Sequence, residues 1–323
     1  ALALAGCGVA PQAPLAERAA ADLAARAGKA TTGTHQGRAY RLFEPPGAAG
    51  KAVPLVVMLH GCGQGAAEIA EITRFDALAA REGFAVLYPE QSGAAHLNRC
   101  WRWFDPADQA RGRGEPGSIR GMVDAVAAKR PLDRDAVYVS GLSAGGAMAG
   151  IVAAAYPDVF AAAGVAAGLE VRAAASEAGA WFAMSMGGPD PLRLAPQLVD
   201  AMGQNRRAMP VMAFHGTLDY VVKPVNGEQV VAQWRAVDDR ILRETGGSVA
   251  ERAETQSGQA PGGHRFEREL YRDHAGRGLL ERYAVAGMAH AWPGGASGHA
   301  FSDPAGPDAT RLMWAFFKAN RKV

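Results

Sequence analysis

The stretch VYVSGLSAGGAM, from Val137 to Met148, decides the fold. A short apolar run enters the pattern Gly-x-Ser-x-Gly and leaves into a run of small residues, which predicts a strand, a tight turn and a helix with Ser143 at the apex. Gly141 and Gly145 fit such a turn because strand and helix approach so closely there that larger side chains would collide. Ser143 is therefore the candidate nucleophile.

Apolar runs on both sides of this turn predict further strands. They lie at residues 53–60, 84–89, 161–168 and 210–216, and helical patterning separates them, for example over 69–82 and 118–129. Alternating strands and helices predict an α/β fold with a mostly parallel central sheet and helices on both faces. We also expect an edge strand at 38–43, a surface loop at 246–263, a hairpin at 265–285 and a terminal helix at 309–320.

One catalytic domain is expected over residues 38–323, with a candidate lid in the irregular segment 169–209. Residues 1–10 resemble the remnant of a signal peptide, because they are apolar, lack an initial Met and end in small residues. Leu4-Ala5-Gly6-Cys7 is similar to a bacterial lipobox, in which Cys7 is lipidated; a plain secretory signal is the alternative. Residues 11–37 are rich in Ala and are interpreted as a spacer.

The composition narrows the class of partner. The chain has 323 residues, of which 49% are hydrophobic and 20% charged, and its net charge is +2 with both signs interspersed. No basic stripe indicates a nucleic-acid partner, and no apolar run reaches the roughly 18 residues that span a bilayer. We therefore expect an exported monomer that is tethered to a membrane, if at all, through Cys7.

Export also decides how the cysteines are interpreted. With Cys7 used for lipidation, Cys62 and Cys100 remain as an even pair in an oxidising compartment, which predicts a Cys62–Cys100 disulfide. Two buried free thiols are the alternative. The spacing of Cys and His predicts no metal site.

A serine nucleophile needs a base that is oriented by a third group, and after a nucleophile elbow these follow in the order acid, then histidine. Asp219 lies just past the predicted strand 210–216, and His290 lies in the glycine-rich loop after the last predicted strand. Ligands bind at such strand ends in α/β sheets. The rival acids are Asp190 and Asp200, and the rival histidine is His299.

An oxyanion that develops during acyl transfer needs two preorganised donors. One is expected to be the backbone N–H of Ala144, directly after the nucleophile, and the other an amide in the turn 60–63, for which Cys62 is favoured. The predicted disulfide would then hold this turn against the loop that carries Trp101. His60 and His215 end apolar strands and are interpreted as hydrogen-bonded structural histidines.

Five motifs, taken in order, resemble the secreted polyhydroxyalkanoate (polyhydroxybutyrate) depolymerase family of esterases. They are HGCGQ at 60–64, LYPEQ at 87–91, NRCWRWF at 98–104, GLSAGGAM at 141–148 and GMAHAW at 287–292. The resemblance runs from about residue 39 to the end of the chain. It implies an α/β-hydrolase fold, ester hydrolysis through an acyl-enzyme, no cofactor, and a triad of Ser143, Asp219 and His290.

The same resemblance implies Cys62 and Ala144 as oxyanion donors, and aromatic residues near the site that grip the polymer. Trp292, two residues after the candidate base, is the first candidate, followed by Trp101 and Trp103; packing in the core is the alternative for all three.

Secreted members of this family commonly carry a linker and a separate polymer-binding domain, whereas the given sequence ends soon after its expected terminal helix. The leading hypothesis is therefore a serine esterase acting on short-chain polyhydroxyalkanoate polyesters, their soluble oligomers or other small esters. Feruloyl and acetylxylan esterases share the fold and similar motifs and are the rival enzymes. A tethered binding protein that lost turnover is the remote alternative, because fold alone does not decide function.

Overall fold

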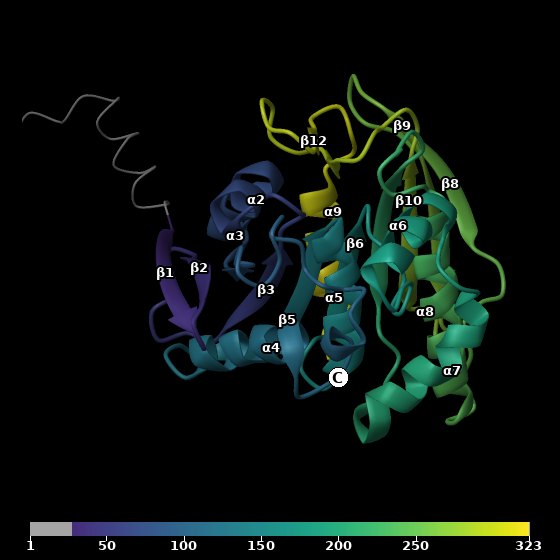
Figure 1. Cartoon of the computed structure of the whole chain (residues 1–323), viewed down its shortest axis with the longest axis horizontal. Coiled ribbons are helices and arrows are strands. Elements are labelled where there is room, and N and C mark those ends of the chain that lie inside the picture. Colours follow the sequence, from purple (N-terminus) through teal and green to yellow (C-terminus); the bar gives the residue numbers. More distant parts are fainter. Residues whose placement is uncertain (1–27, 323) are drawn as a thin grey trace, which may run out of the picture.

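The computed structural model describes residues 28–322, and its scaffold is a ten-stranded sheet (Figure 1). The strands lie in the order β1-β2-β4-β3-β5-β6-β7-β10-β9-β8. The strands from β4 to β10 in this order are parallel, and antiparallel strands extend both edges. Their bounds are β1 Lys29–His35, β2 Arg38–Glu44, β3 Val53–Leu59, β4 Ala85–Pro89, β5 Leu132–Leu142, β6 Ala162–Ala166, β7 Val211–Gly216, β8 Glu254–Gln259, β9 Arg265–Arg272 and β10 Gly278–Val285.

The unbroken apolar run of β3 explains why the sheet is covered on both faces. Leu55 and Val57 belong to the hydrophobic core on one face, and Val56 and Met58 to the core on the other. All four side chains are fully buried. Because successive side chains of a strand point to opposite faces, an apolar strand of this kind needs helices on both sides.

Two groups of helices supply that cover. One core contains residues of α2 (Ala66–Thr73), α3 (Phe75–Glu82) and α9 (Ala309–Ala319). The other contains residues of α4 (Gly114–Ala127), α5 (Ala144–Ala155), α7 (Pro191–Met202) and α8 (Val225–Arg243). Figure 1 shows α5 on the near side of the central strands and α9 behind them. This arrangement confirms the predicted fold class.

The sheet begins earlier in the chain than predicted. Residues 29–35, assigned to the spacer, form β1 and pair antiparallel with β2. Most β1 side chains are exposed, and their sequence shows no alternation of apolar and polar residues. The strand is therefore held mainly by its backbone hydrogen bonds. The predicted signal remnant at 1–10, the lipidated Cys7 and the spacer up to residue 27 lie outside the described residues. Within residues 28–322, no helix is long and apolar enough to cross a membrane.

The segment 169–209 is more regular than predicted, because it contains α6 (Glu177–Met186) and α7. Ser176 caps α6 by accepting a hydrogen bond from Gly179 N (3.1 Å), and Asp190 caps α7, which begins with Pro191. Ser or Asp at the N-cap and Pro at the first helical position are sequence signals for these starts. The loop predicted at 246–263 likewise contains β8, a polar edge strand that pairs with β9.

Candidate active site

The turn between β5 and α5 has the geometry that its glycines predict. Ser143 adopts φ 59° and ψ −123°, a region that residues with a side chain rarely occupy. A Cβ atom on Gly141 would lie 2.2 Å from backbone atoms of Gly145, and one on Gly145 would lie 2.3 Å from the carbonyl oxygen of Leu59. Any larger residue would therefore push strand and helix apart and move Ser143.

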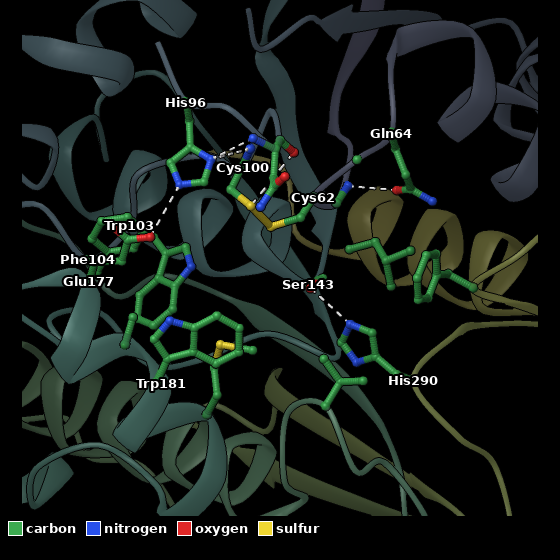
Figure 2. Close-up of a pocket in the computed structure, with 18 residues that line it drawn as sticks. Cys62, Gln64, His96, Cys100, Trp103, Phe104, Ser143, Glu177, Trp181 and His290 are labelled. Atoms are coloured by element: carbon green, nitrogen blue, oxygen red, sulfur yellow. Dashed lines mark hydrogen bonds and ion pairs between the residues drawn. A yellow bond between two sulfur atoms is a disulfide. The ribbon is translucent and has the colours of Figure 1, made fainter. Parts of the chain in front are cut away.

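Two further loops bring side chains to Ser143. Asp219 follows β7 and His290 follows β10, and these neighbouring strands are parallel, so their carboxyl ends meet at one edge of the sheet. His290 Nε2 lies 2.9 Å from Ser143 Oγ, as the dashed line in Figure 2 marks. His290 Nδ1 lies 2.7 Å from Asp219 Oδ2. The three side chains thus form one continuous hydrogen-bonded chain.

Asp219 is 1% exposed and is surrounded by donors. Its Oδ1 accepts hydrogen bonds from Val221 N (2.9 Å) and Val222 N (2.8 Å). Burial by itself would raise the pKa of Asp219, but hydrogen bonds from His215 and His290 and the Val222 amide together lower it well below its usual range. An ionised Asp219 keeps the proton of His290 on Nδ1 and leaves Nε2 free to accept one from Ser143.

The rival residues lie in other surroundings. Asp190 caps α7 through Leu192 N (2.9 Å), and His299 Nε2 lies 3.9 Å from Glu71. Asp200 is exposed within α7. His215 is buried and donates from Nε2 to the carbonyl oxygen of Val222 (2.8 Å), with Asp219 Oδ2 at 3.4 Å from the same nitrogen.

Ser143 and His290 open into a cavity of about 370 Å³ that has two walls (Figure 2). The loop wall consists of residues 96–104, of which His96, Asn98, Cys100, Trp103 and Phe104 line the cavity. The helix wall is α6, which contributes Glu177, Ala180, Trp181 and Met184. Most of the lining is apolar, and no group of three or more His, Cys, Asp or Glu in residues 28–322 is arranged to hold a metal ion.

The turn after β3 lies directly against Ser143, since a Cβ on Gly61 would be 3.4 Å from Ser143 Cβ. Two amides of this turn have acceptors: Gly61 N donates to Gln64 Oε1 (2.7 Å) within the turn, and Gly63 N donates to the carbonyl oxygen of Asn98 in the loop wall (2.7 Å). In the part of the chain that the structure describes, the amides of Cys62 and Ala144 have no acceptor. The predicted disulfide between Cys62 and Cys100 is present and joins this turn to the loop wall.

The three predicted aromatic residues do not share one location. Trp103 lines the cavity, but Trp292 and Trp101 are 0% exposed and lie outside it. Trp292 packs against Phe75 and donates from Nε1 to Thr310 Oγ1 (3.1 Å), so it belongs to the core beneath α9. Trp101 lies against His60, with their ring centroids 5.5 Å apart. Proximity in sequence to His290 was misleading because the chain turns between residues 290 and 292.

Several lining residues had no signal in the sequence. Trp181 of α6, Val221 after Asp219, and Phe301 reach the cavity from three separate segments. Phe301 packs edge-on against His290, with the ring centroids 5.9 Å apart. Trp181 and its neighbour Phe182 in α6 are 66% and 67% exposed, so the structure presents two adjacent aromatic side chains to solvent there.

A parallel sheet with helices on both faces, a serine at a nucleophile elbow, and an acid and a histidine that follow it in this order define the α/β-hydrolase fold. Comparison with known proteins is more specific. The model of the esterase PHB depolymerase family matches residues 38–257, and the chain belongs to this family.

Relatives carry several activities in their names. Poly(3-hydroxyalkanoate) depolymerase C of Paucimonas lemoignei is 34% identical over 81% of this chain, and feruloyl esterase B of Neurospora crassa is 30% identical over 57%. The chain spans 60% and 64% of these relatives' own lengths. Acetyl xylan esterase from Aspergillus awamori has the same fold, with a TM-score of 0.70, 20% identity, and coverage of 90% of this chain and all of that one.

Proposed function

We propose that the chain is a serine esterase that hydrolyses short-chain polyhydroxyalkanoate polyesters or their oligomers through an acyl-enzyme. The observation that carries the proposal is the chain of hydrogen bonds from Asp219 through His290 to Ser143 Oγ at the base of an apolar cavity. Membership of the esterase PHB depolymerase family supports the same reaction.

In the acylation step, Ser143 Oγ attacks the ester carbonyl while His290 Nε2 takes the hydroxyl proton. Asp219 stabilises the imidazolium that forms and keeps its ring in place. The tetrahedral intermediate then collapses, the bond to the alkoxy oxygen breaks, and His290 returns the proton to the leaving alcohol. For a polyester, this alcohol is the hydroxyl end of the next part of the polymer.

The negative charge of the intermediate is assigned to the amides of Cys62 and Ala144. Both belong to turns that adjoin Ser143, and neither has an acceptor within residues 28–322, so both are available to a substrate oxygen. Donors that are already in place need no reorganisation when the charge appears. In deacylation, water attacks the acyl carbonyl with His290 as base, and the acid is released from Ser143.

The surroundings of the cavity support a polyester rather than a sugar ester. Aromatic and aliphatic side chains line it, and the segments that supply this lining carry further exposed apolar side chains. Trp181, Phe182 and Met186 of α6 are 66–68% exposed, and Tyr220, next to the lining residue Val221, is 73% exposed. An apolar surface of this kind fits a water-insoluble chain of short hydroxyacid units better than a polysaccharide.

The same proposal covers the organisation of the chain. Residues 38–323 act as one catalytic domain, and residues 169–209, with α6 over the cavity, act as its cover. The disulfide supports export to an oxidising compartment, and the sequence around Cys7 supports lipidation there. We propose that the exported enzyme works as a monomer.

The test measures product release by the wild type and by Ser143→Ala from three substrates: amorphous poly(3-hydroxybutyrate) film, a soluble 3-hydroxybutyrate trimer and a feruloylated or acetylated sugar. We expect Ser143-dependent release of 3-hydroxybutyrate from film or trimer, with a loss of at least about 10³-fold in Ser143→Ala. Release of ferulate or acetate alone would mean that the substrate is a carbohydrate ester and not a polyester. Binding to film without hydrolysis of any ester would overturn the enzyme itself.

A further inference from the structure

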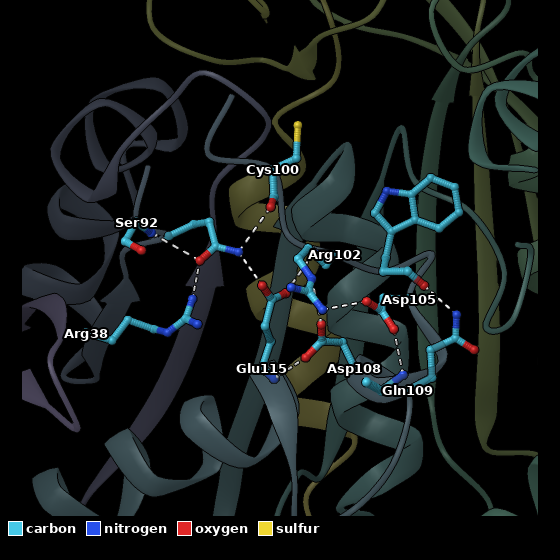
Figure 3. Close-up of polar contacts among 11 residues, drawn as sticks. Arg38, Ser92, Cys100, Arg102, Asp105, Asp108, Gln109 and Glu115 are labelled. Carbon is cyan, nitrogen blue, oxygen red and sulfur yellow. Dashed lines mark hydrogen bonds and ion pairs between the residues drawn. The ribbon is translucent and has the colours of Figure 1, made fainter. Parts of the chain in front are cut away.

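A buried polar network contacts the loop wall through residues that do not line the cavity (Figure 3). Gln91, just after β4, is 0% exposed, and both polar atoms of its side chain form hydrogen bonds. Its Nε2 donates to the carbonyl oxygen of Cys100 (3.0 Å) and to Glu115 Oε1. Its Oε1 accepts hydrogen bonds from Arg38 Nη1 and from Ser92 N (3.1 Å). Gln91 therefore joins β2, the chain after β4, the loop wall and α4.

Glu115 lies in the first turn of α4 and is 2% exposed. Its two oxygens accept from different donors: Oε1 from Gln91, and Oε2 from the amide of Arg102 in the loop wall (2.7 Å). The Arg102 guanidinium pairs in turn with Asp108 (3.0 Å), which also accepts from the Glu115 amide (2.7 Å). The loop wall is thus held at both Cys100 and Arg102.

The network also reaches the turn that carries Cys62. The amide of Gln91 donates to His60 Nε2 (3.0 Å), so the proton of this imidazole is on Nδ1, from which it donates to the carbonyl oxygen of Gly61 (2.7 Å). Burial lowers the pKa of His60, which keeps it in this neutral form. Gly61 precedes Cys62, and Cys62 is bonded to Cys100. His60, at the start of the Cys62 turn, and Cys100, the disulfide partner of Cys62, are therefore both hydrogen-bonded to Gln91.

We propose that Gln91 and Glu115 are positioning residues of the esterase, which hold the Cys62 amide where it donates to the oxyanion. The proposal rests on the proposed function. Neither side chain lines the cavity, so both act through His60, Cys100 and Arg102. An oxyanion donor is effective only when its direction is set before the charge develops. A network that removes freedom from both ends of the disulfide sets that direction.

The protonation state of Glu115 decides which hydrogen bonds this network can form. Burial raises the pKa of Glu115 to about 7, the Arg102 amide lowers it, and Asp108 raises it further. Both oxygens face N–H donors, so a proton on either oxygen displaces one hydrogen bond. The charged and titratable groups around Glu115 and Gln91 come from β2, the end of β3, the loop wall and the 3₁₀ helix after it: Arg38, His60, Arg102, Asp105 and Asp108. The ionised carboxylate is the form that holds the loop wall.

The test uses three variants and a soluble p-nitrophenyl ester of a short-chain acid. In Glu115→Gln, an NH₂ group faces an N–H donor from which the carboxylate accepted a hydrogen bond. In Gln91→Glu, a second carboxylate faces Glu115. In the double variant, the new side-chain amide at position 115 donates to the new carboxylate at position 91, and only the contact with Cys100 stays lost. We expect kcat to fall about 10-fold in each single variant with KM changed less than 2-fold, because oxyanion donors act in the transition state. The double variant recovers part of the loss.

Two measurements separate positioning from loss of folding. Active sites are counted with a phosphonate that labels Ser143, so kcat refers to folded enzyme. Asp238→Asn is the matched control: Asp238 is a fully buried carboxyl of α8 that accepts from Met209 N (2.8 Å), and it does not line the cavity. It should leave kcat per labelled site unchanged.

The pH profile gives a second readout. In the wild type the acid limb of log kcat should contain the ionisation of Glu115 near pH 7, and in Glu115→Gln that ionisation should be absent. A kcat per labelled site equal to that of the wild type in both single variants would overturn the proposal. A wild type that hydrolyses no ester overturns the proposed function instead, and this is known before any variant is compared.

Discussion

The two walls of the cavity are built in opposite ways. The loop wall is joined to the Cys62 turn by a disulfide and to α4 by Glu115. The helix wall, α6, is held by its Ser176 cap and by contacts of Met184 O with Lys223 N (2.8 Å) and Asn226 Nδ2 (3.3 Å). Its outer side chains are exposed apolar residues. The loop wall is fixed by buried polar groups, whereas the helix wall exposes apolar side chains to solvent.

A buried glutamate beneath each wall shows the same contrast. Glu115 has a hydrogen-bond donor on each oxygen. Glu170 is 2% exposed, but within the described chain neither of its oxygens has a partner. It lies against the segment that follows α6, since a Cβ on Gly188 would be 2.6 Å from Glu170 Oε1. Burial raises the pKa of Glu170 to about 9, helped by the charge of Asp190.

This difference teaches where precision is needed in such a site. In the proposed mechanism, the loop wall adjoins the Cys62 amide, which must point at a developing charge, and small displacements of such donors are costly. The helix wall adjoins the part of the cavity proposed to hold the polyester, a flexible, apolar substrate that needs contact area more than exact orientation. The hydrogen bonds of Gln91 and Glu115 rigidify the first wall, and a partnerless carboxyl leaves the second less stable.

Removal of the disulfide should have the largest effect. The Cys62→Ser/Cys100→Ser variant frees a loop with a sequence separation of 38 residues, which lowers the free energy of unfolding by about 4 kcal/mol if the loss is entropic. It also frees the Cys62 amide, so kcat on a soluble ester should fall by roughly 10- to 100-fold with little change in KM. Denaturant titration and steady-state kinetics measure the two effects.

The control for this variant is the wild type treated with a thiol reductant, which opens the same bond without a substitution. Both samples should lose kcat to a similar extent. If stability falls while kcat per folded enzyme is unchanged, the loop wall is fixed by Glu115 and Gln91 alone and the disulfide serves only stability.

A substitution at Glu170 should act mainly on stability. Its pKa is raised from 4.5 in the unfolded chain to about 9 in the folded one. The folded state therefore holds a proton that the unfolded state has released between these values, and this contribution to stability is lost as pH rises from about 4.5 to 9. In Glu170→Met that slope should disappear, and the free energy of unfolding at pH 8 should be higher than that of the wild type by roughly 2–4 kcal/mol.

The matched comparison is Glu115→Gln, because the pKa of Glu115 is also raised, to about 7, but its carboxylate is hydrogen-bonded. This variant should flatten the slope only between about pH 4.5 and 7, and it should not stabilise the protein at pH 8, since one hydrogen bond that the carboxylate accepts is lost. Urea titrations of both variants at pH 5, 7 and 8 measure this. A Glu170→Met variant that is less stable than the wild type at pH 8 would contradict the contrast between the two glutamates.

The strand–turn–helix at Ser143 was predictable because its chemistry is local: two glycines are required within five residues. The positions of Asp219 and His290 were also predictable, since both follow strands whose carboxyl ends meet at one edge. The disulfide could be predicted from the number of cysteines once export was assumed. In each case the signal is short in sequence and the physical reason for it is strong.

Features that depend on packing between distant segments could not be predicted. Trp292 and Trp103 look alike in sequence, but one is covered by α9 and the other borders the cavity. β1 carries no apolar alternation, because an exposed edge strand is held through its backbone. Phe301 reaches His290 from a separate loop. The partners of Glu115 come from elements more than ten residues away, and no local pattern encodes them.

Removal of apolar area from the helix wall should have the smallest effect and should be confined to insoluble substrate. Phe182 and Met186 are 67% and 68% exposed and do not line the cavity, so Phe182→Ser/Met186→Ser leaves the reacting groups in place.

The lost contact area corresponds to roughly 1–2 kcal/mol of adsorption, or about 5- to 30-fold weaker binding to polyester film. Film turbidity assays should show this loss, whereas kcat/KM on a soluble trimer should stay within about 2-fold. Leu192→Ser, on α7 and 53% exposed, is the control and should change neither rate. Equal losses on film and trimer would mean that α6 acts on the reacting groups, and the two walls would then share one role.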